Sequence, residues 1–285
     1  MRAIYRKSLR VIRSAILAFL ITAVGTAVWG VLITVNLRTS PEIPWSVGIM
    51  AAVLWAMWNY LGGKWWPRST SEARRRYLRA KRVPFRTFAW AFLAGALSIV
   101  ALAGLWIVSF RLVRMAPNAV PAMAGYPWLT VVPVLIMASL VAPFCEEAAF
   151  RGYCQVCLEC EFRLPVAVLL SSMLFALAHL THGVFLAKLF VYFLAGVVFG
   201  ATAGLTQSTL PAIPVHIAAD LTFFVLVWPH DAARHLVSED GADWAFWIHL
   251  AQIVLFAPLA VLAFRRLAKE TEGLRPARGI PVSPN

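Results

Sequence analysis

Ionisable side chains gather in one stretch of an otherwise apolar chain, residues 146–220. The members that matter most are Glu146, Glu147, Arg151, His179, His216 and Asp220. Residues four apart lie on one side of a helix, so Glu147 can pair with Arg151, and His216 lies beside Asp220. Carboxylates and imidazoles that meet in a low-dielectric site are the groups that acid–base chemistry on a water molecule requires.

Each of these groups also has a structural interpretation. Glu147 and Arg151 can form an ion pair that only stabilises a helix, and we expect this role for Arg151. A single buried histidine can be a packing or hydrogen-bonding residue. His182, three residues after His179, could be a second base or ligand, but it lies beside Gly183 in a short loop.

The elements that position these groups are expected to be membrane helices. Of the 285 residues, 61% are hydrophobic and 14% are charged, whereas a soluble domain carries about 25% charged residues. We predict an all-α fold, a polytopic membrane helix bundle with about eight transmembrane helices, because apolar blocks of roughly 20 residues match a ~30 Å hydrocarbon core. The predicted blocks are 15–35, 44–62, 88–110, 128–145, 165–181, 184–206, 209–228 and 244–264.

The basic residues predict that both termini are cytoplasmic. The N-terminal arm, the loop 63–87 and the C-terminal tail hold most of the 26 Lys and Arg residues, and cytoplasmic loops carry an excess of positive charge. This rule accounts for the formal net charge of +13. We therefore expect the lipid bilayer, and not a nucleic acid, to be the partner of the basic residues. Lys188, near the outer end of its block, is expected to extend its amine to the membrane interface.

The cysteines predict neither a metal site nor a disulfide. Cys154, Cys157 and Cys160 have the spacing C-x-x-C-x-x-C, and the residues between them suit a helix. Positions i, i+3 and i+6 of a helix do not converge on one ion. The expected cytoplasmic location also disfavours a disulfide.

The three polar segments read, in chain order, as EEAAFR at 146–151, FALAH at 175–179 and HIAAD at 216–220. On successive membrane helices they resemble the E-E-x-x-x-R, F-x-x-x-H and H-x-x-x-N/D motifs of the CPBP family. These are the CAAX-processing and bacteriocin-processing intramembrane endopeptidases, which are related to the type II CAAX prenyl endopeptidase. The resemblance covers residues 128–228, roughly, and the other predicted spans match no motif of the family.

The resemblance implies a role for each motif residue. Glu146 would be the general base that activates a water molecule, and His179 would share that water. His216 and Asp220 would stabilise the oxyanion of the tetrahedral intermediate. The positions that would orient and support the site are Glu147, Arg151 and Phe175. The implied reaction is hydrolysis of a peptide bond in a membrane-bound protein or peptide, with a prenylated CAAX-type substrate as one option.

Two features of the implied site leave alternatives open. An ionised Asp220 cannot donate a hydrogen bond to an oxyanion as an asparagine would, so it either carries a proton or orients His216. We expect catalysis without a cofactor, but Glu146, His179 and His216 could equally hold zinc, as two histidines and a glutamate do in many metallopeptidases.

The chain is predicted to have three regions. Residues 1–127 form a three-helix membrane region with the basic loop 63–87, residues 128–228 form the catalytic core, and residues 229–285 form the last membrane helix and a basic cytoplasmic tail. The excess of Arg over Lys, with Ala-, Val- and Leu-rich spans, favours a prokaryotic plasma membrane. Two other functions fit these residues: a non-catalytic immunity or scaffold protein on the same fold, and a proton-coupled transporter whose glutamate and histidines relay protons.

Overall fold

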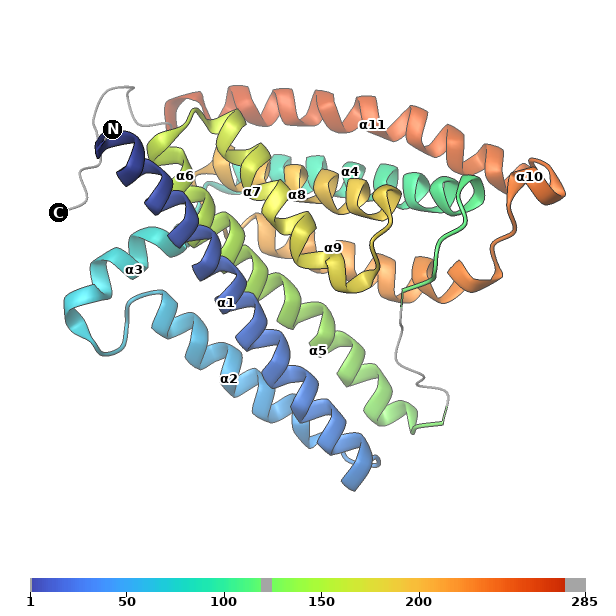
Figure 1. Ribbon diagram of the computed structural model, residues 1–285, viewed down its shortest axis with the longest axis horizontal. Helices are drawn as coiled ribbons and strands as arrows, with labels where there is room; N and C mark the ends of the chain where they lie inside the picture. The colour runs from blue at the N-terminus through green and yellow to red at the C-terminus, as the bar shows by residue number, and fades with distance from the viewer. Residues whose placement is uncertain (1, 119–124, 275–285) are drawn as a thin grey trace.

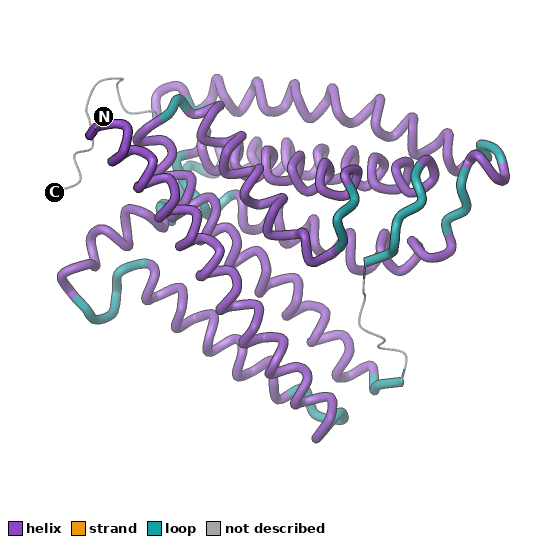
Figure 2. The backbone as a smooth tube through the Cα atoms, viewed as in Figure 1, coloured by secondary structure: helices purple, strands orange, loops and turns teal. Residues whose placement is uncertain are grey.

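The protein is a bundle of helices. A computed structural model describes residues 2–118 and 125–274, and within these ranges every regular element is a helix (Figure 2). Seven helices or runs of helix are long and apolar enough to cross a membrane, which confirms the predicted all-α, multi-pass bundle. Each of these seven spans contains one long α-helix. These helices are α1 (Arg2–Thr39), α4 (Phe85–Leu112), α5 (Trp128–Glu146), α7 (Leu164–Ala178), α8 (Leu186–Thr206), α9 (Ala212–Thr222) and α11 (Trp244–Glu270).

The predicted block 44–62 forms α2 (Trp45–Leu61), an apolar helix of only 17 residues. Gly63 follows it with a φ of 73°, a conformation that L-residues with side chains rarely adopt, and a Cβ there would lie 2.0 Å from the Ser71 carbonyl oxygen. The turn at Gly63 therefore limits the length of α2. This helix runs back beside α1, and the start of α1 and the end of α11 lie at the same end of the bundle (Figure 1).

The long helices pack in two groups. In Figure 1, α11 runs along α4 and α7 lies beside α8, whereas α1, α2 and α5 form an oblique group. Small residues allow the close crossings: a Cβ on Gly104 would lie 2.9 Å from the His249 carbonyl oxygen, and one on Gly196 would lie 2.9 Å from Ser172 Cβ. Membrane helices commonly associate through such small residues, because lipid provides no hydrophobic drive for packing.

Short elements connect the spans and carry parts of the site. Helix α5 continues without a break into the π-helix η2 (Glu147–Cys154) and then α6 (Gln155–Glu161). On the loops lie η1 (Arg68–Thr70) and α3 (Ser71–Leu78), then η3 (His179–His182). After α9 come the π-helix η4 (Phe223–Val227), η5 (Trp228–Ala233) and α10 (Val237–Asp240), and η6 (Glu272–Leu274) follows α11. The end of the predicted basic tail, 275–285, lies outside the described residues.

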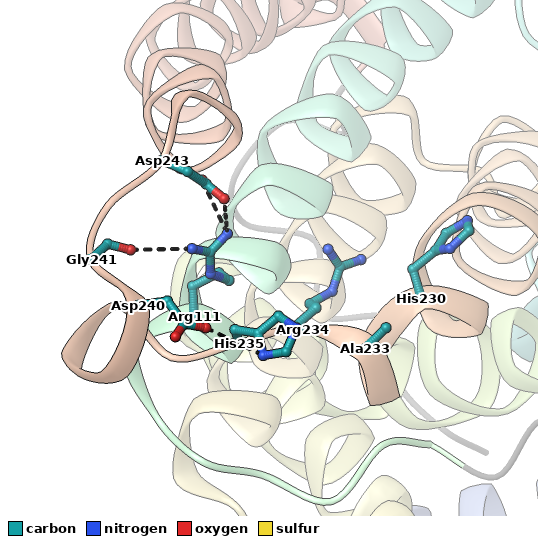
Figure 3. Close-up of a pocket in the computed structure, with 8 residues that line it drawn as sticks. All are labelled: Arg111, His230, Ala233, Arg234, His235, Asp240, Gly241 and Asp243. Atoms are coloured by element: carbon teal, nitrogen blue, oxygen red, sulfur yellow. Dashed lines mark hydrogen bonds and ion pairs between the residues drawn. The ribbon is translucent and has the colours of Figure 1, made fainter.

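A network of ion pairs fastens the segment before α11 to the end of α4. Figure 3 shows Arg111 with its guanidinium directed at Asp243, whose carboxylate oxygens both lie 3.1 Å from Arg111 Nη1. Asp243 also accepts a hydrogen bond of 2.8 Å from the Phe246 N–H and so caps α11. These residues border a pocket of about 300 Å³ in which basic and acidic side chains are mixed. We interpret this pocket as part of the contact that holds the segment before α11 against the end of α4.

Asp243 should make stability depend on pH. The Phe246 N–H, and after it the Arg111 guanidinium, hold the pKa of Asp243 below its usual 3.8. Such a group stabilises the fold above its unfolded-state pKa, and this contribution is lost as pH falls through the lower folded-state value. Asp243→Ala should therefore lower the melting temperature of the detergent-solubilised protein at pH 7, and the difference from wild type should shrink below pH 3.8.

The control is Asp240→Ala, which removes a carboxylate of the same loop that pairs with the exposed His235. Its effect on the melting temperature at pH 7 should be smaller, because Asp240 caps no membrane helix. An unchanged melting temperature for Asp243→Ala at pH 7 would contradict the attachment that we describe.

Candidate active site

The first motif lies where α5 passes into the π-helix η2. Glu147 and Arg151 are completely buried, and Arg151 Nη1 lies 3.4 Å from Glu147 Oε1. The expected ion pair is therefore present. The Arg151 guanidinium also lies 4.2 Å from the centre of the Phe175 ring and donates to the Gly196 carbonyl oxygen over 3.3 Å. One cation thereby connects η2 with α7 and α8.

The second carboxylate of the motif orients a histidine of α9. Glu147 Oε1 accepts a hydrogen bond of 2.9 Å from His216 Nδ1, so this nitrogen carries a proton. The other ring nitrogen, Nε2, then faces Glu146 Oε2 at 3.7 Å and Asp220 Oδ1 at 3.6 Å. The ring stacks on Phe199 with a centroid distance of 4.1 Å. His216 is thus held among three acidic side chains.

The carboxylates around His216 retain hydrogen-bonding capacity. Glu146 Oε2, Glu147 Oε2 and Asp220 Oδ2 are buried, and none has a hydrogen-bond partner among the described residues. The distances from His216 Nε2, 3.7 Å to Glu146 Oε2 and 3.6 Å to Asp220 Oδ1, exceed that of a good direct hydrogen bond, about 2.7–3.2 Å. Since buried polar atoms are normally satisfied by protein or ordered water, these lone pairs suit a small polar ligand such as water.

His179 is held in one tautomer by the residue four positions before it. His179 Nδ1 lies 2.8 Å from the Phe175 carbonyl oxygen, which can only accept, so Nδ1 carries the proton. Nε2 then keeps a lone pair. The imidazole lies between two rings, Phe175 at 4.6 Å and Tyr192 at 4.2 Å between centroids. The F-x-x-x-H spacing therefore supplies both a hydrogen bond and a packing surface.

One cavity of about 430 Å³ collects these groups. The four predicted catalytic residues that line it are Glu146, His179, His216 and Asp220. Glu147 and Arg151 do not line it but lie behind His216 and Phe175. Much of the remaining wall is aromatic, and the rings that form it are Trp106, Phe175, Tyr192, Phe199, Phe223, Phe224 and Trp228. The structure thus brings together residues of α5, η3 and α9 that are far apart in the sequence.

Lys188 does not reach the membrane interface as expected. It is 1% exposed, and its ammonium donates to Asn118 Oδ1 over 2.7 Å and to the His182 carbonyl oxygen over 3.1 Å. The expectation was wrong because these interior acceptors replace the water that an interfacial amine would bind. Sequence reasoning also missed Tyr192, although it lies four residues after Lys188 and so on the same face of α8.

A buried arginine outside the motifs also supports the site. Arg79 follows α3, where it adopts a φ of 53°. Its Nη2 donates to the Arg151 carbonyl oxygen over 3.1 Å, and its Nη1 pairs with Glu159 Oε2 at 2.7 Å. The basic loop 63–87 is therefore fastened to the helix that carries the first motif, a contact that no local pattern in the sequence indicates.

Among the described residues, no three His, Cys, Asp or Glu side chains are grouped so that they could hold a metal ion. Glu146, His179 and His216 line one cavity but do not form such a group. All four cysteines are free, and Cys157 and Cys160 lie on the helix α6, as their spacing predicts.

Comparison with known proteins agrees with the motifs. Residues 127–222 match the family model described as type II CAAX prenyl endopeptidase Rce1-like, and all three motifs fall within this segment. The match confirms the resemblance to the CPBP family, which is a family of membrane proteases. Searches of curated proteins and of solved structures each gave no significant match.

Removal of Arg151 should destabilise the fold strongly. Arg151→Met leaves the Glu147 carboxylate buried with one charge partner fewer, and loss of one member of a buried pair costs about 3–5 kcal/mol. Reversible unfolding in mixed micelles, followed by circular dichroism, would measure the loss. Arg10→Met is the control: Arg10 pairs with Glu161 at 2.8 Å, but its side chain is 49% exposed, so the cost should be about 0–1 kcal/mol. Equal losses would contradict the structural role of the buried pair.

Proposed function

We propose that the protein is an intramembrane endopeptidase that hydrolyses a peptide bond of a membrane-bound protein or peptide with a water molecule activated by Glu146. The observation that carries the proposal is the single cavity, enclosed by apolar helices, that Glu146, His179, His216 and Asp220 line together. Peptide hydrolysis needs a base for water, a group that polarises the carbonyl and a proton for the leaving amine. These four side chains supply all three.

The attack begins with water between Glu146 and His179. Glu146 Oε2 accepts one proton from the water, while the lone pair on His179 Nε2 holds the second O–H in place. The water oxygen bonds to the substrate carbonyl carbon, and the carbonyl oxygen takes up the electron pair of the C=O double bond. The orphaned Glu146 oxygen and the fixed tautomer of His179 support these two roles.

The oxyanion is stabilised by His216. Its Nδ1–H is occupied by Glu147, so Nε2 is the nitrogen that serves the cavity. We propose that Asp220, at 3.6 Å, keeps a proton on Nε2 so that this N–H donates to the oxyanion. The tetrahedral intermediate then collapses, the C–N bond breaks, and Glu146 returns its proton to the leaving amine. The products are a carboxylic acid and an amine, and the acid then passes the second proton of the attacking water to the amine, which leaves a carboxylate and an ammonium group.

The setting of the reaction follows from the helices around it. The substrate is a membrane-bound segment that reaches the cavity from the bilayer, and prenylated CAAX-type peptides are candidates because of the family match. We further propose a multi-pass location in a prokaryotic plasma membrane, with the N-terminus and the basic loop 63–87 on the cytoplasmic side.

Loss of the base or of its partner should abolish cleavage. Glu146→Gln and His179→Ala should each lower turnover of an internally quenched, farnesylated CAAX peptide by at least about 10²-fold, a typical contribution of general acid–base catalysis. Comparison of peptides from membranes that contain wild type or Glu146→Gln, by mass spectrometry, would identify cellular substrates. Glu72→Gln and His235→Ala, at exposed positions, are the matched controls and should keep wild-type turnover. Near wild-type turnover in either cavity variant, with an unchanged melting temperature, would overturn the catalytic assignment.

The reaction is proposed to need no metal ion. Purified enzyme dialysed against 1,10-phenanthroline and then freed of the chelator should retain its activity, and its zinc content should not correlate with turnover. Loss of activity that zinc restores would instead favour the set Glu146, His179 and His216 as ligands. Glu146→Gln should then also lower zinc binding, which atomic absorption would detect.

A further inference from the structure

A buried chain of hydrogen bonds, made by residues outside the three motifs, ends at the cavity. Lys188 Nζ donates to Asn118 Oδ1 over 2.7 Å, and Asn118 Nδ2 donates to the Tyr192 hydroxyl over 2.9 Å. The Tyr192 hydroxyl lies 2.7 Å from His182 Nδ1. The first three residues are buried, and both Tyr192 and His182 line the cavity. The chain therefore connects the interior of the bundle with a side chain that a substrate can reach.

The first donor fixes the direction of the first two bonds in this chain. An ammonium group only donates, so the Asn118 oxygen is its acceptor and the Asn118 nitrogen is left to donate. The Tyr192 oxygen accepts that bond, and its one hydrogen, which has no other acceptor among the described residues, is directed at His182 Nδ1. His182 is therefore neutral with its proton on Nε2, and Nε2–H is the group that remains for the cavity.

His182 lies against the imidazole of the second motif. The rings of His182 and His179 meet edge to face with centroids 5.3 Å apart. His179 offers a lone pair on Nε2, because its Nδ1–H is taken up by the Phe175 carbonyl oxygen. His182 thus places a donor beside the acceptor that holds the attacking water, and a donor is the complement of the C=O that a peptide main chain carries.

The burial of Lys188 supports a role beyond packing. In the part of the chain that the structure describes, no carboxylate lies within ion-pair distance of Nζ, and its hydrogen-bond acceptors are a neutral amide and a backbone carbonyl. An apolar residue of similar size would avoid the cost of burying this charge. The charge instead sets the direction of the hydrogen bonds. Because the ammonium group can only donate, the series of bonds that starts at Lys188 leaves an N–H donor on His182 at its other end.

We propose that His182 contacts the substrate and that its Nε2–H donates to a main-chain carbonyl oxygen of the bound peptide. Lys188, Asn118 and Tyr192 are positioning residues that hold His182 in this tautomer. The identity of the ligand rests on the proposed peptidase function, but the tautomer is a property of the substrate-free protein. The two parts can therefore be tested separately.

The tautomer is tested by NMR on the full-length protein in micelles, labelled with ¹⁵N-histidine. The signals of His182 are identified by their loss in His182→Gln. Wild type should show the Nε2–H tautomer, and Tyr192→Phe should lose it because the hydroxyl donor is gone. Asn118→Asp is the sharper variant: the new carboxylate still accepts from Lys188 but takes the Tyr192 hydrogen as well, which leaves His182 Nδ1 without its donor.

Tyr153→Phe is the matched control. It removes a buried hydroxyl that donates to the Leu61 carbonyl oxygen over 2.9 Å, away from the cavity. This variant should leave the His182 signals unchanged. A wild-type His182 with its proton on Nδ1, or signals that do not respond to Tyr192→Phe and Asn118→Asp, would overturn the inference.

The substrate contact is tested by kinetics with the farnesylated, internally quenched peptide. His182→Ala and Tyr192→Phe should each lower kcat/KM by about 10-fold, and the double variant should lose no more than His182→Ala alone, because both act through one donor. Independent losses that multiply, or normal kcat/KM in correctly folded variants, would overturn the role of His182 while wild-type cleavage preserved the proposed function. Failure of the wild type to cleave would reject both proposals for this peptide, and the NMR result would still decide the tautomer.

Discussion

The buried Glu147 carboxylate is the group on which the arrangement of the site depends, because it bonds to residues of two different helical segments. It pairs with Arg151 at 3.4 Å and accepts from His216 Nδ1 at 2.9 Å. In a low-dielectric interior, a carboxylate that loses its partners destabilises the fold by several kcal/mol, so both partners are held in place. The orientation of His216, with Nε2 toward Glu146 and Asp220, follows from this requirement.

The helical turn at the junction of α5 and η2 explains how two consecutive glutamates serve different purposes. Successive residues of an α-helix point about 100° apart, and here Glu146 faces the cavity while Glu147 faces the packed interior. Isolated π-helical turns recur at functional sites. This one is fastened from outside, since Arg79 donates to the Arg151 carbonyl oxygen and a Cβ on Gly152 would lie 3.0 Å from the Tyr77 carbonyl oxygen.

The sequence predicted seven of the eight spans and the residues of the cavity because both depend on local features of the chain. Apolar block length sets each span, and i, i+4 spacing places Glu147 with Arg151 and Phe175 with His179. The remaining features depend on tertiary contacts. Lys188 meets an amide 70 positions away in the sequence, Arg79 meets a carbonyl 72 positions away, and no helical pattern records such pairs. The predicted domain boundaries and the orientation in the membrane stay predictions.

The balance of charge in the cavity explains why proton transfer is feasible inside a bilayer. Glu146, Glu147 and Asp220 are three acidic groups, whereas Arg151 is the one permanently charged cation among the motif residues. Isolated charge is costly at this depth, and the second proton that His216 carries in the proposed mechanism offsets part of the excess. When Glu146 takes a proton from water, the total charge of the cluster and its ligand does not change. The proton moves only over the short distance from the water to the Glu146 carboxylate. A cluster of this composition lowers the cost of ionising water because the compensating groups are in place before the substrate arrives.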